Sequence, residues 1–348
     1  MNYRKRMLRL GDVMKRARLD AFLVTDETNV SYLTGFLGHD SMLLVTGGSR
    51  CFITDSRYAE EAEETVSGCK VTVVERSTYE TIGEIVSRER LKKVGFESSD
   101  LPYAVARRLA SSIKGAHLVP LKDAVEDIRS VKDAEEIGLI RRAVAVTKEV
   151  IGEAVRTLRT GISEEAVAEK VEMEFIKRGA RCAFEPIVAF GRNSSKPHAR
   201  ATGKAIGRNG PVMVDIGCKK DGYCADMTRM VSLGRVKDRF RRMLDTVKRA
   251  QERAIEKISP GTRIADVDMA ARDYIRGEGF GAHFGHALGH GVGLGVHEKP
   301  SVSPLNCEML KPGMVFTVEP AVYIPGFGGV RIEDMVLVTE KGSEVLTQ

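Results

Sequence analysis

Four carboxylates lie in apolar stretches that predict β-strands, where an isolated charge would be costly. Residues 212–231 predict a β-hairpin, with Asp215 on the first arm and Asp226 on the second. Asp221-Gly222, between the arms, is a strong signal for a tight hairpin turn. Because an unpaired buried charge is very unfavourable, two carboxylates on paired strands indicate a bound cation.

A second stretch repeats this pattern farther along the chain. Residues 315–320 form an apolar strand that ends in Glu319-Pro320, and a glycine- and proline-rich turn covers residues 325–329. The return arm carries Glu333. Each acid alone could be a surface residue on an exposed strand face. Four acids in two matched hairpins instead predict that the carboxylates surround one point.

Such a cluster would hold metal ions. Two divalent cations would balance its four negative charges. A shell of carboxylates with one or two imidazoles suits hard or borderline ions such as manganese, cobalt, iron or zinc. Two ions ~3.5–4 Å apart can share a bridging water and lower its pKa towards neutrality, which makes the water a nucleophile.

Histidines near these acids are the next candidates for the site. Three of the seven lie in one segment, residues 286–298: His286, His290 and His297. Glycine at every second position from 289 to 295 lets the backbone approach its neighbours closely and disfavours a helix, so a zinc-binding HxxxH helix is not expected. His198 lies on a turn-rich loop and is a fourth candidate. A lone histidine is more often structural, and His39, His117 and His283 carry no comparable signal.

Two helix pairs precede the hairpins and should position them. The pairs are predicted at about residues 133–158 with 163–178, and 238–258 with 264–275. Each pair is followed by a histidine-bearing segment and then by an acidic hairpin. Residues 135–234 and 235–340 therefore predict two copies of one unit, with the hairpins meeting near a pseudo-twofold axis. Chance similarity of amphipathic helices is the alternative, and the matched hairpins argue against it.

The first 125 residues alternate strand and helix and show no chemistry of their own. The strands are predicted at residues 21–25, 42–46, 51–54, 71–74, 93–96 and 117–119, and the helices near 3–18, 57–66, 78–90 and 102–113. This alternation predicts an α/β domain over residues 1–125. A joint near residues 126–134 would separate it from the second domain, residues 126–348.

Composition limits the classes of partner. The 348 residues carry a net charge of +6, and the basic runs lie on predicted helices, so no nucleic-acid partner is expected. The six cysteines show no disulfide or zinc spacing, which favours a reduced, cytoplasmic setting. The charged N-terminal stretch is neither a signal peptide nor a membrane span, and no membrane partner is expected.

Several motifs together resemble one known family. They are GRNSSKPH, VDIG…ADMTR, HALGHGVGLGVHE, FTVEPAVYI and GGVRIED, with NVSYLTGF near the N-terminus. They are similar to the creatinase/prolidase/methionine aminopeptidase family, whose catalytic domain has the pita-bread fold. The fold class implied is α/β (α+β), with a creatinase-type N-terminal domain followed by a pseudo-twofold pita-bread domain.

The resemblance implies a binuclear metal centre made by five residues. Asp215 would bind one ion, His290 and Glu319 would bind the other, and Asp226 and Glu333 would bridge both. Glu319 would also be the general base towards the bridging water. Manganese is the expected metal, and cobalt, zinc and iron are also compatible.

The resemblance also implies roles around the metals. His198 and His297 would contact substrate, stabilise the tetrahedral intermediate and shuttle protons. His286 would line a proline pocket. Arg331 and Thr228 would support the bridging ligands.

The activity implied is hydrolysis of the Xaa-Pro bond at the N-terminus of peptides, in a homodimeric enzyme that acts on proline-containing peptides. Some prolidases place an arginine four residues after the last histidine of the motif, where this chain has Ser301. This favours an Xaa-Pro aminopeptidase over an Xaa-Pro dipeptidase, which is the alternative. A creatinase and a non-catalytic pita-bread binding module are remoter alternatives, because the implied metal ligands are all present.

Overall fold

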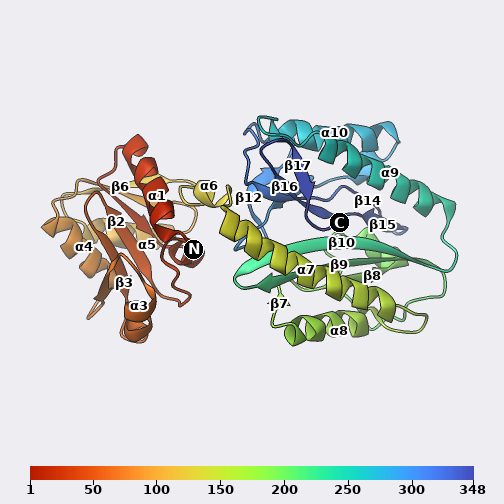
Figure 1. Ribbon diagram of the computed structural model, residues 1–348, viewed down its shortest axis with the longest axis horizontal. Helices are drawn as coiled ribbons and strands as arrows, with labels where there is room; N and C mark the ends of the chain where they lie inside the picture. The colour runs from red at the N-terminus through yellow and green to blue at the C-terminus, as the bar shows by residue number, and fades with distance from the viewer. The chain divides into compact units, whose positions relative to one another are not determined.

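The computed structural model describes residues 1–348, and the chain divides into two compact units, Met1–Arg129 and Ser130–Gln348 (Figure 1). The division falls at the end of helix α6 (Glu126–Arg129). The sequence places the boundary directly before this helix, after residue 125, and that exact position stays a prediction.

The N-terminal unit contains a six-stranded sheet in the order β4-β3-β2-β1-β5-β6. Its strands are β1 (Ala21–Val24), β2 (Met42–Thr46), β3 (Arg50–Thr54), β4 (Lys70–Val73), β5 (Lys93–Glu97) and β6 (His117–Leu121). The central strand β1 is buried throughout, because it pairs antiparallel with β2 and parallel with β5 and is apolar on both faces. All six predicted strands are confirmed.

Helices of this unit were predicted less completely. The four predicted ones are present as α1 (Tyr3–Ala17), α3 (Ala59–Thr65), α4 (Thr78–Arg88) and α5 (Tyr103–Ser112). Helix α2 (Glu27–Thr34) was not predicted. The β-branched Thr28 and Val30 weaken its helical signal. Its ends are nevertheless defined, because the Asp26 side chain accepts from the N–H of Asn29 at 2.8 Å and Gly35 ends it at φ +84°.

The C-terminal unit follows the predicted duplicated order. Its first half contains α7 (Ala134–Thr157), α8 (Glu164–Lys177), β7 (Arg181–Cys182), β8 (Ile187–Phe190), η1 (Gly191–Ser195), β9 (Gly210–Lys220) and β10 (Tyr223–Leu233). Its second half contains α9 (Asp238–Glu256), α10 (Ile264–Gly277), η2 (Gly281–His283), β11 (Gly289–Gly291), β12 (Glu298–Val302), β13 (Val315–Val318), β14 (Ala321–Ile324), β15 (Gly328–Arg331), β16 (Asp334–Val338) and β17 (Ser343–Val345). Asp133 and Glu136 form a capping box at the start of α7, where the sequence predicts that helix to begin.

The first acidic hairpin is regular. Strands β9 and β10 pair antiparallel without a break over eleven residues each. The turn residues Asp221 and Gly222 have φ of 50° and 85°, as a type I′ turn requires. Asp215 faces Thr228 across the ladder and Asp226 faces Gly217. Both acids therefore lie within continuous, buried strands.

The second acidic hairpin is interrupted. The sequence predicts a single hairpin around the turn at residues 325–329, whereas β13 pairs with β16 in a five-stranded sheet and β14 pairs with β15 in a separate two-stranded sheet. The break falls between Val318 and Ala321 on one arm and between Arg331 and Asp334 on the other. Pro320 lies in this break and has no N–H to give to a ladder. Glu319 and Glu333 therefore lie at the ends of short strands.

Each half of this unit has its own hydrophobic core. One core packs α7 and α8 against β9 and β10, and the other packs α9 and α10 against β13 to β16. Figure 1 shows α9 and α10 on one side of the sheets and α8 on the other. None of the helices combines the length and apolar character needed to span a bilayer.

Candidate active site

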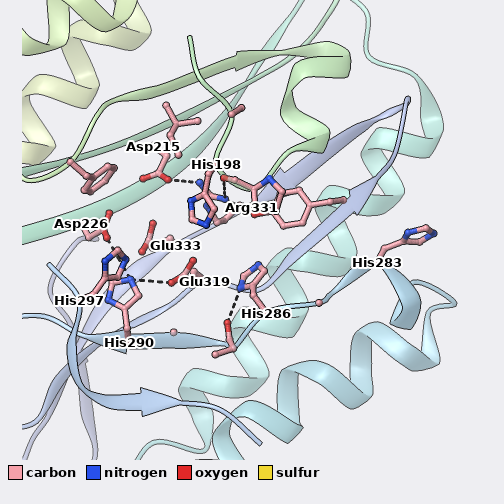
Figure 2. Close-up of a pocket in the computed structure, with 18 of the residues that line it drawn as sticks. His198, Asp215, Asp226, His283, His286, His290, His297, Glu319, Arg331 and Glu333 are labelled. Carbon is pink, nitrogen blue, oxygen red and sulfur yellow. Dashed lines mark hydrogen bonds and ion pairs between the residues drawn. The ribbon is translucent and has the colours of Figure 1, made fainter. Parts of the chain in front are cut away.

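The predicted site residues come together in one cavity of about 870 Å³ in the C-terminal unit (Figure 2). Nine of them line its wall: His198, Asp215, Asp226, His286, His290, His297, Glu319, Arg331 and Glu333. The tenth, Thr228, is fully buried and contacts two members of the wall. The residues come from both halves of the unit, so the predicted meeting of the two hairpins is confirmed.

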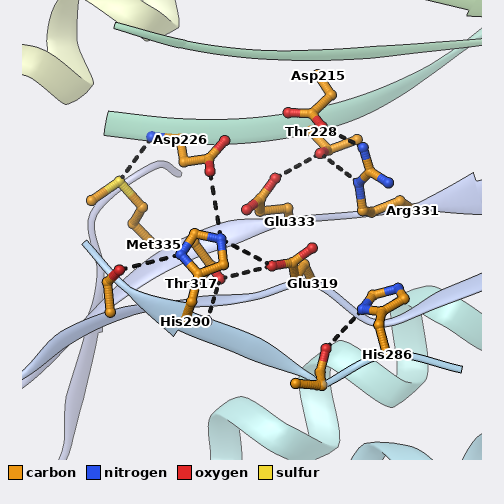
Figure 3. Close-up of polar contacts among 12 residues, drawn as sticks. Asp215, Asp226, Thr228, His286, His290, Thr317, Glu319, Arg331, Glu333 and Met335 are labelled. Carbon is orange, nitrogen blue, oxygen red and sulfur yellow. Dashed lines mark hydrogen bonds and ion pairs between the residues drawn. The ribbon is translucent and has the colours of Figure 1, made fainter. Parts of the chain in front are cut away.

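Thr228 and Arg331 join the two hairpins (Figure 3). The Thr228 hydroxyl donates to Glu333 at 2.6 Å and accepts from Arg331 Nε at 3.1 Å. The Arg331 guanidinium also pairs with Asp215 and donates to the carbonyl of Pro197 at 3.0 Å. One buried arginine thus holds a carboxylate of the first hairpin and the residue that precedes His198.

His290 is held against Glu319 by the strands on which both lie. A Cβ on the preceding residue, Gly289, would lie 1.9 Å from the carbonyl oxygen of Thr317, so only glycine allows this approach. The N–H of His290 donates to the Thr317 hydroxyl at 3.0 Å, which donates to Glu319 at 3.1 Å. His290 Nε2 then lies 3.3 Å from Glu319 and 3.7 Å from Asp226.

The donor set fits divalent metal ions. One ligand atom each from Asp226, His290 and Glu333 lies within 4.8 Å of the others. One carboxylate oxygen of Asp215 and one of Asp226 are buried without a hydrogen-bond partner. A buried acceptor left unpaired is unfavourable, and a cation would satisfy both oxygens. Carboxylate oxygens with one imidazole match the preferences of manganese, zinc and similar ions.

Crowding of the acids perturbs their ionisation. Burial, followed by the charge of Asp215, raises the pKa of Asp226 well above its usual range. Burial and the charge of Asp226 do the same for the pKa of Glu333. Burial alone would lower the pKa of His290, but its hydrogen bond to Glu319 and the nearby carboxylates raise that pKa to about 9. The cluster therefore strongly favours a positive charge at its centre.

The remaining histidines border this cluster. The rings of His297 and His290 are 4.2 Å apart, and burial together with the charge of His290 lowers the pKa of His297. Burial also lowers the pKa of His286, which favours the neutral form of its ring. The Ala287 carbonyl can only accept, so the His286 Nδ1 that lies 2.8 Å away carries the proton. His286 Nε2 is buried without a partner and is left as an acceptor in the wall.

Several wall residues were not predicted as part of the site: Phe184, Glu185, Arg200, His283 and Tyr323. The Tyr323 hydroxyl accepts from Arg331. A tyrosine in the apolar strand before a glycine-rich turn needs a buried partner for its hydroxyl, and that signal could have identified it. His283 was set aside for lack of a motif, and Figure 2 shows its side chain lying away from the acids. Glu185 and Arg200 carry no sequence signal that separates them from surface charges.

Comparison with known proteins places this arrangement in a family. Residues 138–340 match metallopeptidase family M24, and residues 6–131 match the creatinase/prolidase N-terminal domain. The chain belongs to metallopeptidase family M24. The family binds divalent metals, and the chain is an enzyme, so the non-catalytic alternative is not supported.

Individual relatives cover nearly the whole chain. The Xaa-Pro dipeptidase of Pyrococcus furiosus is 33% identical over 99% of this chain and 98% of its own length. The structure of an Xaa-Pro dipeptidase from Bacillus anthracis matches with a TM-score of 0.96 at 34% identity, covering 100% of this chain and 98% of that one. An X-Pro aminopeptidase from Thermotoga maritima matches with a TM-score of 0.88 at 34% identity, covering 97% of both. The predicted fold, a creatinase-type domain followed by a pita-bread metallopeptidase domain, is confirmed.

Proposed function

We propose that this chain is a metal-dependent Xaa-Pro dipeptidase. The proposal rests on one observation. The buried carboxylates and the His290 imidazole that could hold metal line the same cavity as the side chains of His198, His286 and His297. Relatives named as Xaa-Pro dipeptidases support the dipeptide substrate over the longer peptides that the sequence favours.

Five residues would hold the metals: Asp215, Asp226, His290, Glu319 and Glu333. When bound, two divalent ions supply an activated water and polarise the scissile carbonyl. Glu319, hydrogen-bonded by Thr317, would accept the proton of the attacking water. Thr228 and Arg331 would hold Glu333 and Asp215 in place.

The histidines would handle substrate and protons. Burial and the charge of His290 lower the pKa of His297, which favours a neutral ring that can accept a proton. His198 is exposed on the wall and would contact the substrate. The peptide nitrogen of an Xaa-Pro bond has no hydrogen. The pocket for the proline ring therefore needs an apolar surface and does not need an acceptor for an amide proton. The His286 and Tyr323 rings, 5.8 Å apart, would provide that surface.

Two charged residues of the wall favour a small substrate that carries both an ammonium and a carboxylate. Glu185 and Arg200 are both exposed and both line the cavity. Glu185 would attract the free amino group and Arg200 the C-terminal carboxylate of a dipeptide. Ser301, also in the wall, has no charge to fill that second role. Arg200 therefore offers the positive charge that position 301 lacks.

The test compares wild-type enzyme reconstituted with manganese on Xaa-Pro, Xaa-Pro-Yaa and Xaa-Ala. We expect the highest kcat/KM on Xaa-Pro. Arg200→Ala should lower kcat/KM on the dipeptide about tenfold, the cost of one charge-assisted contact, with little effect on longer peptides. Arg192→Ala, an exposed change on the neighbouring loop, is the control. Equal cleavage of Xaa-Ala would overturn the proline assignment.

A second candidate is an Xaa-Pro aminopeptidase. The uncharged Ser301 and the likeness to the X-Pro aminopeptidase from Thermotoga maritima favour it. A preference of the wild-type enzyme for Xaa-Pro-Yaa over Xaa-Pro would decide for this candidate and leave the metal-binding roles intact. Manganese as the native metal, a homodimer and a cytoplasmic location stay predictions.

A further inference from the structure

A buried ion pair on α10 holds the segment that carries His286. Asp268 is fully buried, and Arg272, one turn later, keeps 18% of its side chain exposed. The guanidinium makes two parallel bonds to the carboxylate, from Nε at 2.7 Å and from Nη2 at 2.9 Å. This two-point geometry is available to arginine and not to lysine.

Both members of the pair also bind the backbone of residues 284–288. Arg272 donates to the carbonyl oxygen of Phe284 at 3.1 Å and to that of His286 at 2.7 Å. The N–H of Leu288 donates to Asp268 at 3.0 Å. Three backbone groups of a five-residue stretch are thus fixed by one ion pair.

This segment has no regular secondary structure. The guanidinium lies over the Phe284 ring at 4.3 Å, and that ring meets His286 edge-on at 5.1 Å. The Leu288 carbonyl accepts from the N–H of Glu319 at 2.8 Å. His286 is therefore placed through contacts on its own backbone and on its neighbouring ring, and the pair itself lies outside the cavity wall.

We propose that Asp268 and Arg272 are positioning residues that fix the orientation of His286 and thereby set the preference for proline after the scissile bond. The inference rests on the proposed function, because it assigns His286 to the proline pocket. Displacement of a pocket group by about 1 Å can cost about 100-fold in rate, so loss of the two-point geometry should be visible in substrate choice.

The main variant is Arg272→Lys, which keeps the charge and removes the fork. We expect the ratio of kcat/KM on Xaa-Pro to that on Xaa-Ala to fall about 10- to 100-fold, with bound metal unchanged. The control is Arg276→Lys on the same helix, where Arg276 pairs with Asp273 at 2.9 Å and both side chains are more than half exposed. The control should leave the ratio unchanged.

A double-mutant cycle separates positioning from a loss of general stability. In a His286→Ala background, Arg272→Lys should no longer change the substrate ratio, because the residue that it positions is gone. If Arg272→Lys lowers the ratio equally in both backgrounds, or lowers activity on both substrates to the same extent, the pair is merely structural and the inference is wrong.

A second readout does not depend on substrate. Nitrogen-15 NMR of the metal-free protein, with the His286 signal identified by its loss in His286→Ala, should show Nδ1 protonated in the wild type and a shifted signal in Arg272→Lys. An unchanged signal would overturn the inference. If the wild type shows no preference for proline, the proposed function fails, and this measurement still decides whether the pair orients His286.

Discussion

The two halves of the C-terminal unit place their carboxylates in different ways. In the first half, Asp215 and Asp226 lie within an unbroken eleven-residue ladder. In the second, Glu319 and Glu333 lie where the ladder divides into two sheets. A short aspartate needs a strand that runs directly under the cluster, whereas a glutamate reaches it from the strand end. The two halves thus bring their carboxylates to the same cavity, although the strands that carry them are paired differently.

The halves also hold their histidine segments differently. In the first half, Glu164 at the start of α8 accepts from Phe190 in β8, Asn193 in η1 and Thr202, which lie on both sides of His198 in the chain. In the second half, Asp268 within α10 needs the partner Arg272 to do the same for the segment of His286. Both acids are fully buried. The equivalent helices α8 and α10 therefore each use a buried acid to hold a histidine-bearing segment. The acid is the first residue of α8 and lies farther along in α10.

Metal removal tests whether both halves depend on one shared centre. Chelated enzyme should lose essentially all activity and regain it with manganese or cobalt. Its melting temperature should also fall, because ligand binding at about 100 times Kd contributes about 2.7 kcal/mol to stability. Activity and calorimetry before and after metal addition provide the measurement. Full activity in protein shown to be free of metal would contradict a binuclear centre.

Removal of one acid from each half should show that the halves contribute equally. Asp226→Ala and Glu333→Ala should each abolish turnover in a folded protein, because each removes a carboxylate that is predicted to hold both metal ions. Turnover, bound metal and circular dichroism would be measured together. Glu340→Ala, an exposed change in the same half as Glu333, is the control. Retention of most activity by either variant would show that the halves are unequal and that the acid removed has no bridging role.

A smaller effect is expected for a histidine that handles protons. His297→Ala should lower kcat by about 10²–10⁴-fold, the usual contribution of a general acid–base group. Its metal content should stay near that of the wild type, because the prediction gives it no ligand role. Metal analysis of the purified variant checks this point, and loss of stoichiometric metal would place His297 among the ligands.

The smallest effect concerns the buried acid of the first half. Glu164→Gln places an amide nitrogen against N–H and O–H donors, so the free energy of unfolding should fall by about 1–3 kcal/mol. Urea denaturation measures this change. Glu165→Gln, at the exposed neighbouring position, should leave stability unchanged. A loss equal to that of the control would mean that Glu164 does not hold the loop of His198.

The sequence alone determined most of the architecture. Strand alternation and turn residues gave the six strands of the N-terminal sheet and the hairpin of β9 and β10, because those signals are local. Charge inside apolar strands identified the four acids of the cavity, since burial of a carboxylate demands a partner wherever the strand lies. The family resemblance then gave the histidines their roles, which stay predictions.

Only the tertiary structure decided the features that depend on packing between distant segments. In the second hairpin, Glu319 contacts His290 and Glu333 contacts Thr228, and both partners lie on other strands. Arg200 and Glu185 look like ordinary surface charges in the sequence and join the cavity only when the loops fold over it. Asp268 and Arg272 fit any amphipathic helix. Arg272 binds the segment of His286 because the carbonyls of Phe284 and His286 lie opposite its guanidinium in the folded chain. The sequence pattern does not contain that information.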